Sequence, residues 1–162
     1  MKDPVSIPRV KLLHPAIRDE VAELIGKIEF ANPAFTIRIV QGLRTIEYQN
    51  ELYAQGRTKP GNVVTKAKGG SSFHNYGLAI DFCLLYNGKV SWDIDDDIDK
   101  DGKADWLEVV DVFKANGYFW GGNFKSIFDA PHLEKSFGYS VKQLLQKYQN
   151  KDFIQGTNYV KL

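Results

Sequence analysis

A single carboxylate, Asp81, interrupts the apolar run of residues 78–86. This run is predicted to form a buried strand that turns at Asn87-Gly88, a strong hairpin signal, into residues 89–92. An ionised carboxylate is costly to bury unless a partner or a metal ion offsets its desolvation. The sequence therefore requires a fold in which Asp81 meets such a partner inside the protein.

The other predicted elements mix helices and strands without a regular βαβ alternation, which favours an α+β fold over a doubly wound parallel sheet. We expect one compact domain over residues 1–162, with a small, mostly antiparallel sheet and flanking helices. The predicted helices cover residues 15–30, 46–55, 106–116 and 141–148, a further strand covers residues 35–40, and loops cover residues 57–72 and 93–105.

Composition and charge exclude several classes of partner. Of the 162 residues, 43% are hydrophobic, which is enough to bury a core without disulfides, and Cys83 is expected to be an inert buried thiol. The formal net charge is only +1, so no strong field attracts nucleic acid or an anionic membrane. No apolar stretch approaches the roughly 18 residues of a membrane span. We expect a monomer that does not insert into membranes and, without a signal-peptide pattern, is made in the cytoplasm.

The sequence has three histidines, His14, His74 and His132, so a metal site that uses two of them has few possible compositions. His74 lies on a turn just before the strand that carries Asp81, and imidazole nitrogen and carboxylate oxygen both bind zinc at about 2.0–2.2 Å. The same pair also fits a structural hydrogen bond, and the residues alone leave both interpretations open. His14 precedes a proline at a predicted helix start, where we expect a packing or helix-end role.

The segment from Ser72 to Asp81 reads Ser-x-His-x-x-Gly-x-Ala-x-Asp. It resembles the signature of the zinc peptidases that cut peptidoglycan, a family of D-Ala-D-Ala carboxypeptidases and L-alanyl-D-glutamate endopeptidases. Residues 129–132, Asp-Ala-Pro-His, resemble a second motif of that family, and the likeness extends over about residues 10–140. It implies the Hedgehog/DD-peptidase fold, a zinc ion, and peptidoglycan peptide stems as substrate. Since the sequence shows no internal repeat and no linker to a second module, we expect a catalytic domain without a separate wall-binding domain.

The resemblance also implies roles for individual residues. Asp129 takes the place of the general base, Arg44 that of the group binding the substrate carbonyl or carboxylate, and Ser72 that of a substrate contact. Glu134 is a rival base, or a partner that orients a ligand. The implied zinc ligands are His74, Asp81 and His132.

The second motif favours one branch of the family, because the carboxypeptidases usually carry Glu where this chain has Asp129. We therefore expect an endopeptidase that cuts between L-alanine and D-glutamate. The alternatives are a D-Ala-D-Ala or L,D-carboxypeptidase on the same scaffold, and a zinc-containing module that binds wall peptides without hydrolysis. A compact catalytic domain of this kind resembles phage endolysins, which reach the wall after the membrane is permeabilised; another export route is the alternative.

A second metal signal follows the hairpin. Asp97 to Glu108 matches Asp-x-Asp-x-Asp-Gly-x5-Glu, the calcium loop of an EF-hand. No helix is predicted before the loop, so we expect a lone Ca²⁺ loop that leads into the helix at Trp106. The alternative to a Ca²⁺ loop is a solvated acidic turn. A calcium sensor is a third class of function for the protein, beside the peptidase and the wall-peptide binding module. The candidate ligands are Asp97, Asp99, Asp101, Lys103 through its carbonyl, Asp105 and Glu108.

Overall fold

The computed structural model describes residues 1–125 and 127–162. Helices and strands are mixed along the chain, as expected for an α+β fold. The helices are α1 (Ser6–Lys11), α2 (Pro15–Ala31), α3 (Ile46–Ala54), the 3-10 helix η1 (Phe73–Tyr76), α4 (Asp105–Ala115), the 3-10 helix η2 (Gly121–Asn123) and α5 (Val141–Gln149). The strands are β1 (Thr36–Gln41), β2 (Ala79–Tyr86), β3 (Lys89–Ser91), β4 (Phe119–Trp120) and β5 (His132–Glu134).

Strand β2 is the centre of an antiparallel sheet. β1 pairs with one edge of β2, and the other edge is shared by β3, opposite residues 84–86, and β5, opposite residues 79–81. β4 then pairs with β5. The small antiparallel sheet predicted from the sequence is confirmed. Since β3 occupies only the end of β2, the start of β2 is free to pair with a segment about fifty residues further along the chain.

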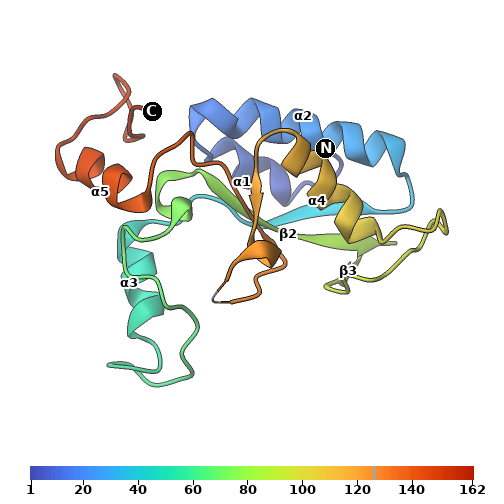
Figure 1. The fold of residues 1–162 in the computed structure, drawn as a ribbon, viewed down its shortest axis with the longest axis horizontal. Helices are drawn as coiled ribbons and strands as arrows, with labels where there is room; N and C mark the ends of the chain where they lie inside the picture. Colours follow the sequence, from blue (N-terminus) through green and yellow to red (C-terminus); the bar gives the residue numbers. More distant parts are fainter. Residues whose placement is uncertain (126) are drawn as a thin grey trace.

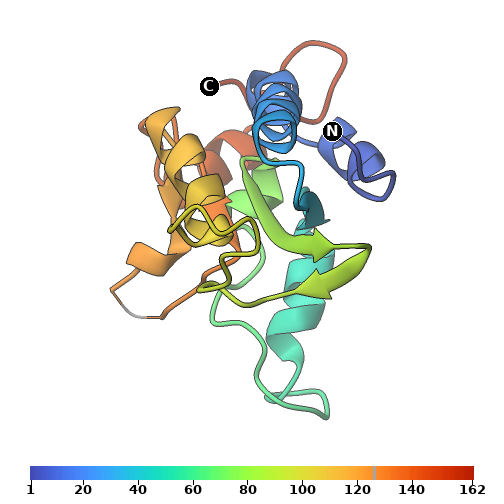
Figure 2. The ribbon, with the colours of Figure 1, turned by 90° about the vertical axis from the view of Figure 1, so that its right-hand side faces the viewer.

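Helix α2 packs its apolar face on the core, as its spacing predicts. His14 caps the helix, because its Nδ1 accepts a hydrogen bond from the backbone N–H of Ala16. Figure 1 shows α1, α2 and α4 together on one side of the sheet, and Figure 2 shows α3 and its following loop extending from the opposite side. The buried residues of the α2 face are Ile17, Val21, Leu24, Ile25 and Ile28.

Other predicted elements agree with the structure to within a residue or two. α5 begins at a capping box, in which Ser140 and Gln143 satisfy each other's backbone N–H groups. α4 begins at Asp105, one residue before the predicted start. The sequence pattern did not predict α1, β4 or β5, because these elements are too short to show a periodicity.

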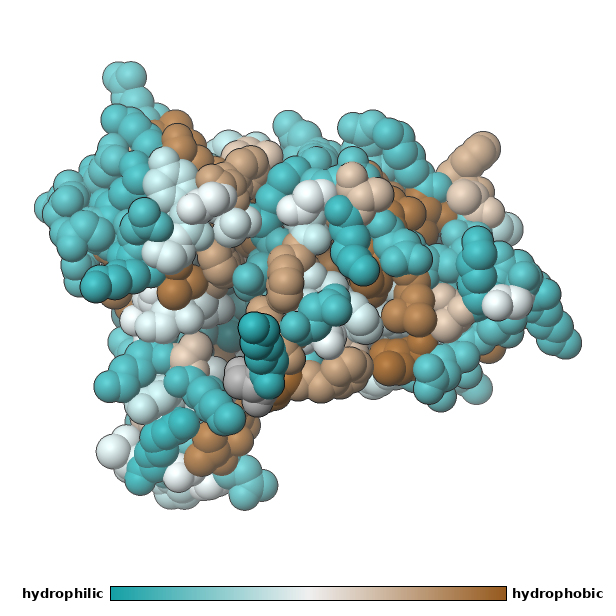
Figure 3. All heavy atoms as spheres, in the orientation of Figure 1, coloured by the Kyte–Doolittle hydropathy of each residue, from teal (hydrophilic) through white to brown (hydrophobic). Residues whose placement is uncertain are grey.

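The surface is mostly hydrophilic on the face shown in Figure 3, with hydrophobic side chains gathered in patches between the polar ones. Within the described residues, no helix combines the length and the apolar composition needed to cross a membrane.

Candidate active site

The pairing of β2 with β5 brings together two residues of the distant sequence motifs. Asp81 is directly opposite His132 in the antiparallel register, so their side chains lie on the same face of the sheet. His74 approaches from η1, which Ser72 caps through its Oγ and Gly77 ends at a φ of 68°. A Cβ at Gly77 would lie 2.8 Å from the backbone nitrogen of His14, so this turn also requires glycine for space.

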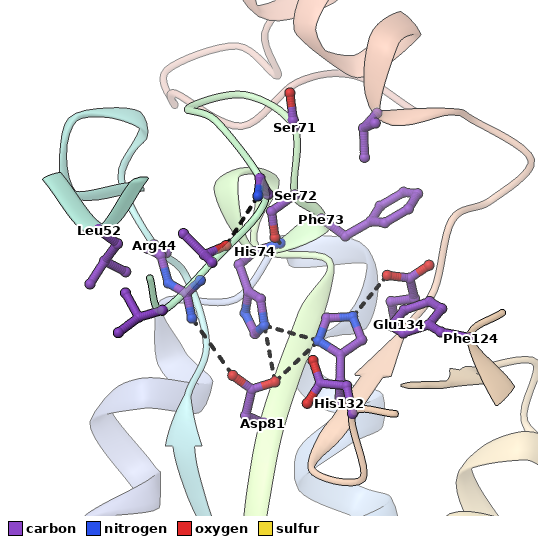
Figure 4. A pocket seen from close by; sticks show the side chains of 15 residues that line it. Arg44, Leu52, Ser71, Ser72, Phe73, His74, Asp81, Phe124, His132 and Glu134 are labelled. Atoms are coloured by element: carbon purple, nitrogen blue, oxygen red, sulfur yellow. Dashed lines mark hydrogen bonds and ion pairs between the residues drawn. The ribbon is translucent and has the colours of Figure 1, made fainter. Parts of the chain in front are cut away.

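Three side-chain atoms meet where these elements converge. His74 Nε2 and His132 Nδ1 each lie 3.1 Å from the Oδ1 atom of Asp81 and 3.2 Å from each other. Figure 4 shows the two imidazoles and the carboxylate directed at one point. Ligand bonds of about 2.0–2.1 Å in a tetrahedral site place neighbouring ligand atoms about 3.3 Å apart. The observed spacing is therefore close to one face of a zinc coordination tetrahedron.

The hydrogen bonds on the far sides of both rings fix which nitrogen faces this point. His74 Nδ1 lies 2.8 Å from the Gly42 carbonyl oxygen, which accepts only, so the ring donates there and Nε2 carries a lone pair when neutral. His132 Nε2 lies 2.8 Å from Glu134 Oε2 and donates in the same way. When both rings are neutral, three acceptor atoms therefore converge without a donor between them, an arrangement that suits a bound cation.

The charges of this cluster shift the proton affinities of its members. Burial raises the pKa of Asp81, but the His74 charge and the hydrogen bonds from His132 and His74 outweigh it and hold that pKa well below its usual range. Burial lowers the pKa of His132, yet its hydrogen bonds to Asp81 and Glu134 raise it to about 9. The cluster therefore stabilises a positive charge at this point, and either a proton or a metal ion can supply it.

The cluster lies in the wall of a pocket of about 470 Å³ that also contains Arg44 and Asp129. Arg44 Nη2 is 3.7 Å from Asp81 Oδ2, and Arg44 Nη1 donates to Gln49 Oε1 at 3.0 Å. Burial, followed by the charge of Asp81, raises the pKa of Asp129. A carboxylate with raised proton affinity beside a candidate metal site is suited to accept a proton from water.

Comparison with known proteins agrees with this arrangement. A model of a D-alanyl-D-alanine carboxypeptidase family matches residues 65–135, the segment that contains both motifs. The chain is 49% identical over 123 residues to the peptidoglycan L-alanyl-D-glutamate endopeptidase CwlK of Bacillus subtilis, an alignment that covers 75% of this chain and 72% of that protein. The chain belongs to the M15 family of metallopeptidases.

The fold of this M15 peptidase is also similar to a solved structure. The L-Ala D-Glu endopeptidase ChiX of Serratia marcescens superposes with a TM-score of 0.56 at 20% identity, over 83% of this chain and 88% of that one. The predicted family and the predicted α+β architecture are therefore both confirmed.

The remaining candidates fall in different parts of this M15 peptidase. Ser72 lines the pocket while its Oγ caps η1. His14 lies away from the cluster, where its Nε2 donates to the Val160 carbonyl, in line with the predicted packing role. The sequence did not single out Gly42, because only the fold shows that its carbonyl orients His74.

The acidic loop of this M15 peptidase lies between β3 and α4. Its carboxylates form two groups with ligand atoms within 4.8 Å of one another, and Asp99 belongs to both. Burial and the charges of Asp101 and Asp99 raise the pKa of Glu108, which shows how crowded the acids are. The first group is Asp97, Asp99 and Asp101, and the second is Asp99, Asp105 and Glu108.

Proposed function

We propose that this M15 peptidase is a zinc-dependent L-alanyl-D-glutamate endopeptidase that cuts the peptide stems of peptidoglycan. The observation that carries the proposal is the convergence of His74 Nε2, Asp81 Oδ1 and His132 Nδ1 on one point. Nitrogen and oxygen donors in this number suit zinc with a position left open for catalysis. The 49% identity to CwlK, which bears that activity in its name, supports the choice of substrate and bond.

In this proposal the protein supplies orientation and proton transfer. Zinc held by the three ligands supplies Lewis acidity toward the attacking water and the scissile carbonyl. Asp129 accepts a proton from the water as the water oxygen bonds to the scissile carbonyl carbon, and it passes that proton to the departing amine as the C–N bond breaks. Glu134 acts through His132, because its carboxylate fixes the orientation of that ring.

Arg44 is the proposed contact for the substrate. Its backbone N–H donates to the His74 carbonyl at 2.9 Å, which ties it to the ligand segment, and its Nε–H is buried without a hydrogen-bond partner among the described residues. A guanidinium held here binds a carbonyl or carboxylate oxygen of the stem and stabilises the charge that develops during attack. Ser72, on the same pocket wall, is the proposed contact for the peptide backbone.

Digestion of purified sacculi tests the function directly. The protein is incubated with sacculi after treatment with a chelator and after addition of zinc, and the released fragments are analysed by mass spectrometry. New N-terminal D-glutamate that requires zinc would support the proposal. Loss of terminal D-alanine would instead show the carboxypeptidase activity in the description of the matched family model, and intact sacculi with bound protein would show a wall-peptide binding module.

The monomeric state and the phage-type lytic role belong to the same proposal. Light scattering tests the first, and lysis of cells only after their membrane is permeabilised tests the second. Calcium, the second cation expected from the sequence, has no step in this mechanism, because its candidate ligands lie on the loop before α4 and on the first turn of that helix, outside the pocket.

A further inference from the structure

A fully buried carboxylate at the start of α4 is only half satisfied. The side chain of Asp105 has 0% exposure, and its Oδ2 atom accepts hydrogen bonds from the Tyr86 hydroxyl at 3.0 Å and the Ile98 N–H at 3.1 Å. Its Oδ1 atom has no hydrogen-bond partner among the described residues. Buried polar atoms are nearly always paired, so an orphaned carboxylate oxygen in the interior calls for a ligand.

A second orphaned oxygen lies in the same group. Glu108 Oε2 is buried and has no partner in the part of the chain that the structure describes. Asp105, Glu108 and Asp99 offer ligand atoms within 4.8 Å of one another. The two residues that carry the orphaned atoms therefore belong to one cluster that is compact enough to surround a single ion.

The loop before α4 completes this cluster. Gly102 takes a φ of 92°, and its N–H donates to Asp97 Oδ2 at 3.0 Å, which closes the loop on itself. In the described residues, none of the five carboxylates from Asp97 to Glu108 forms an ion pair with Lys or Arg. Figure 1 shows this loop at the right-hand end of the molecule, and Figure 3 shows hydrophilic side chains there.

The chemistry of the ligands selects the cation. The cluster offers carboxylate oxygens and no imidazole or thiolate, which favours a hard cation over zinc. Ca²⁺ accepts six to eight oxygens in flexible geometry, whereas Mg²⁺ needs a near-ideal octahedron and retains its waters. A long loop with many carboxylates and a backbone carbonyl at Lys103 suits Ca²⁺.

Helix α4 connects this cluster to the catalytic segment. Trp106 follows Asp105, is fully buried, and its indole N–H donates to the Ala130 carbonyl at 3.3 Å. Trp120 donates to the same carbonyl at 2.7 Å. Ala130 follows the proposed base, Asp129, in the chain. The Trp106 side chain and its hydrogen bond to Ala130 therefore link the start of α4 to the segment that carries the base.

We propose that the segment from Asp97 to Glu108 binds one Ca²⁺ ion, and that the bound ion braces the backbone of Asp129 and Ala130 through Trp106. The ion fixes the first turn of α4 because Asp105 and Glu108 both lie on it. The position of Trp106 is then fixed, and with it the hydrogen bond to Ala130. The Ca²⁺ site does not depend on what the pocket hydrolyses.

Calcium titration of the zinc-loaded protein, followed by calorimetry, thermal unfolding and amide hydrogen exchange, tests both parts. We expect one Ca²⁺ per chain, a Tm increase of about 5–10 °C at a hundred times the Kd, and slower exchange in residues 129–133. The isosteric variant Glu108→Gln is expected to weaken binding by about tenfold or more, because it removes a ligand charge. Asp95→Asn, which removes one carboxylate charge from the loop before α4 and outside the ligand set, is expected to leave the affinity unchanged.

Three outcomes would overturn the proposal. Absence of both binding heat and a Tm shift in the wild type would exclude the site. Equal Ca²⁺ affinity of Glu108→Gln and Asp95→Asn would exclude the ligand set. If Glu108→Gln unfolds, Asp97→Asn in the half-buried part of the loop takes its place. Binding of Ca²⁺ with unchanged exchange in residues 129–133 would exclude the brace. None of these measurements uses hydrolysis, so they stand apart from the proposed peptidase activity.

Discussion

The Nε2 atom of His132 lies 2.8 Å from a carboxylate oxygen of Glu134, two residues further along the same strand. Because alternate residues of a strand share a face, β5 carries both a candidate ligand and the group that orients it. Glu134→Gln is therefore expected to lower zinc affinity by about tenfold or more while the fold is retained. Competition with a chromogenic chelator measures this, with Glu47→Gln, an exposed residue of α3, as control. Unchanged zinc affinity with lost hydrolysis would instead identify Glu134 as the base.

The opposite pattern is expected for Asp129. Asp129→Asn should bind zinc like the wild type, yet its kcat on purified sacculi should fall by about 10²–10⁴, the usual contribution of a general base. Zinc content by atomic absorption and fragment release by mass spectrometry separate the two effects. Near-normal turnover in this variant would place the base elsewhere.

The histidines offer a matched test of the ligand set. His74→Ala is expected to lose zinc, because it removes one of the three converging atoms. His14→Asn should keep one zinc per chain, since His14 lies outside the cluster, but it loses the hydrogen bond to the Val160 carbonyl. Its unfolding free energy should fall by about 1–3 kcal/mol, the cost of an unsatisfied buried group. Equal zinc contents in the two variants would contradict the assignment.

Acid is expected to destabilise the packing of the N-terminal segment. Asp3 is buried and accepts hydrogen bonds from Ser6 and Arg38. Burial raises its pKa, but these bonds outweigh burial and hold the pKa of Asp3 below its ordinary value. Its contribution is therefore fully present above the unfolded pKa of about 3.9 and is lost as the pH falls through the lower folded pKa. Asp3→Asn should lower stability at pH 7 and flatten the acid limb of a denaturation series; an unchanged acid limb would contradict this.

Close packing around the proposed base gives a further prediction. A Cβ at Gly121 would lie 2.4 Å from the Asp129 carbonyl oxygen and 2.8 Å from the His132 Cβ. Gly121→Ala should therefore displace the segment and reduce activity by more than about tenfold, since small misplacements at an active site are costly. Gly26→Ala in α2 meets only an ordinary contact at 3.5 Å and should be neutral or stabilising. Activity assays and thermal unfolding of both variants check this.

The sequence predicted the features that depend on local pattern. The helical spacing of Ile17, Val21 and Ile28 predicted α2, and the apolar run with Asn87-Gly88 predicted β2 and its hairpin. The two motifs predicted the candidate ligands, although nothing in the spacing alone places them together.

The features that the sequence missed depend on long-range pairing. β5 has only three residues and forms because it pairs with β2, so no local pattern marks it. The Gly42 carbonyl orients His74 from thirty-two residues away. α1 contains Pro8 and covers only six residues, too few for a periodic signal. For β5 and for the orientation of His74, the deciding partner is distant in the chain.

The direct opposition of Asp81 and His132 ties the proposed zinc site to the assembly of the sheet. If β5 slipped by one residue along β2, the His132 imidazole would turn to the other side of the sheet. Only two of the three converging ligand atoms would then remain together. Chains with misaligned strands would then emerge without zinc. The zinc stoichiometry of a purified preparation would therefore count the molecules whose sheet has closed correctly, independently of any enzymatic assay.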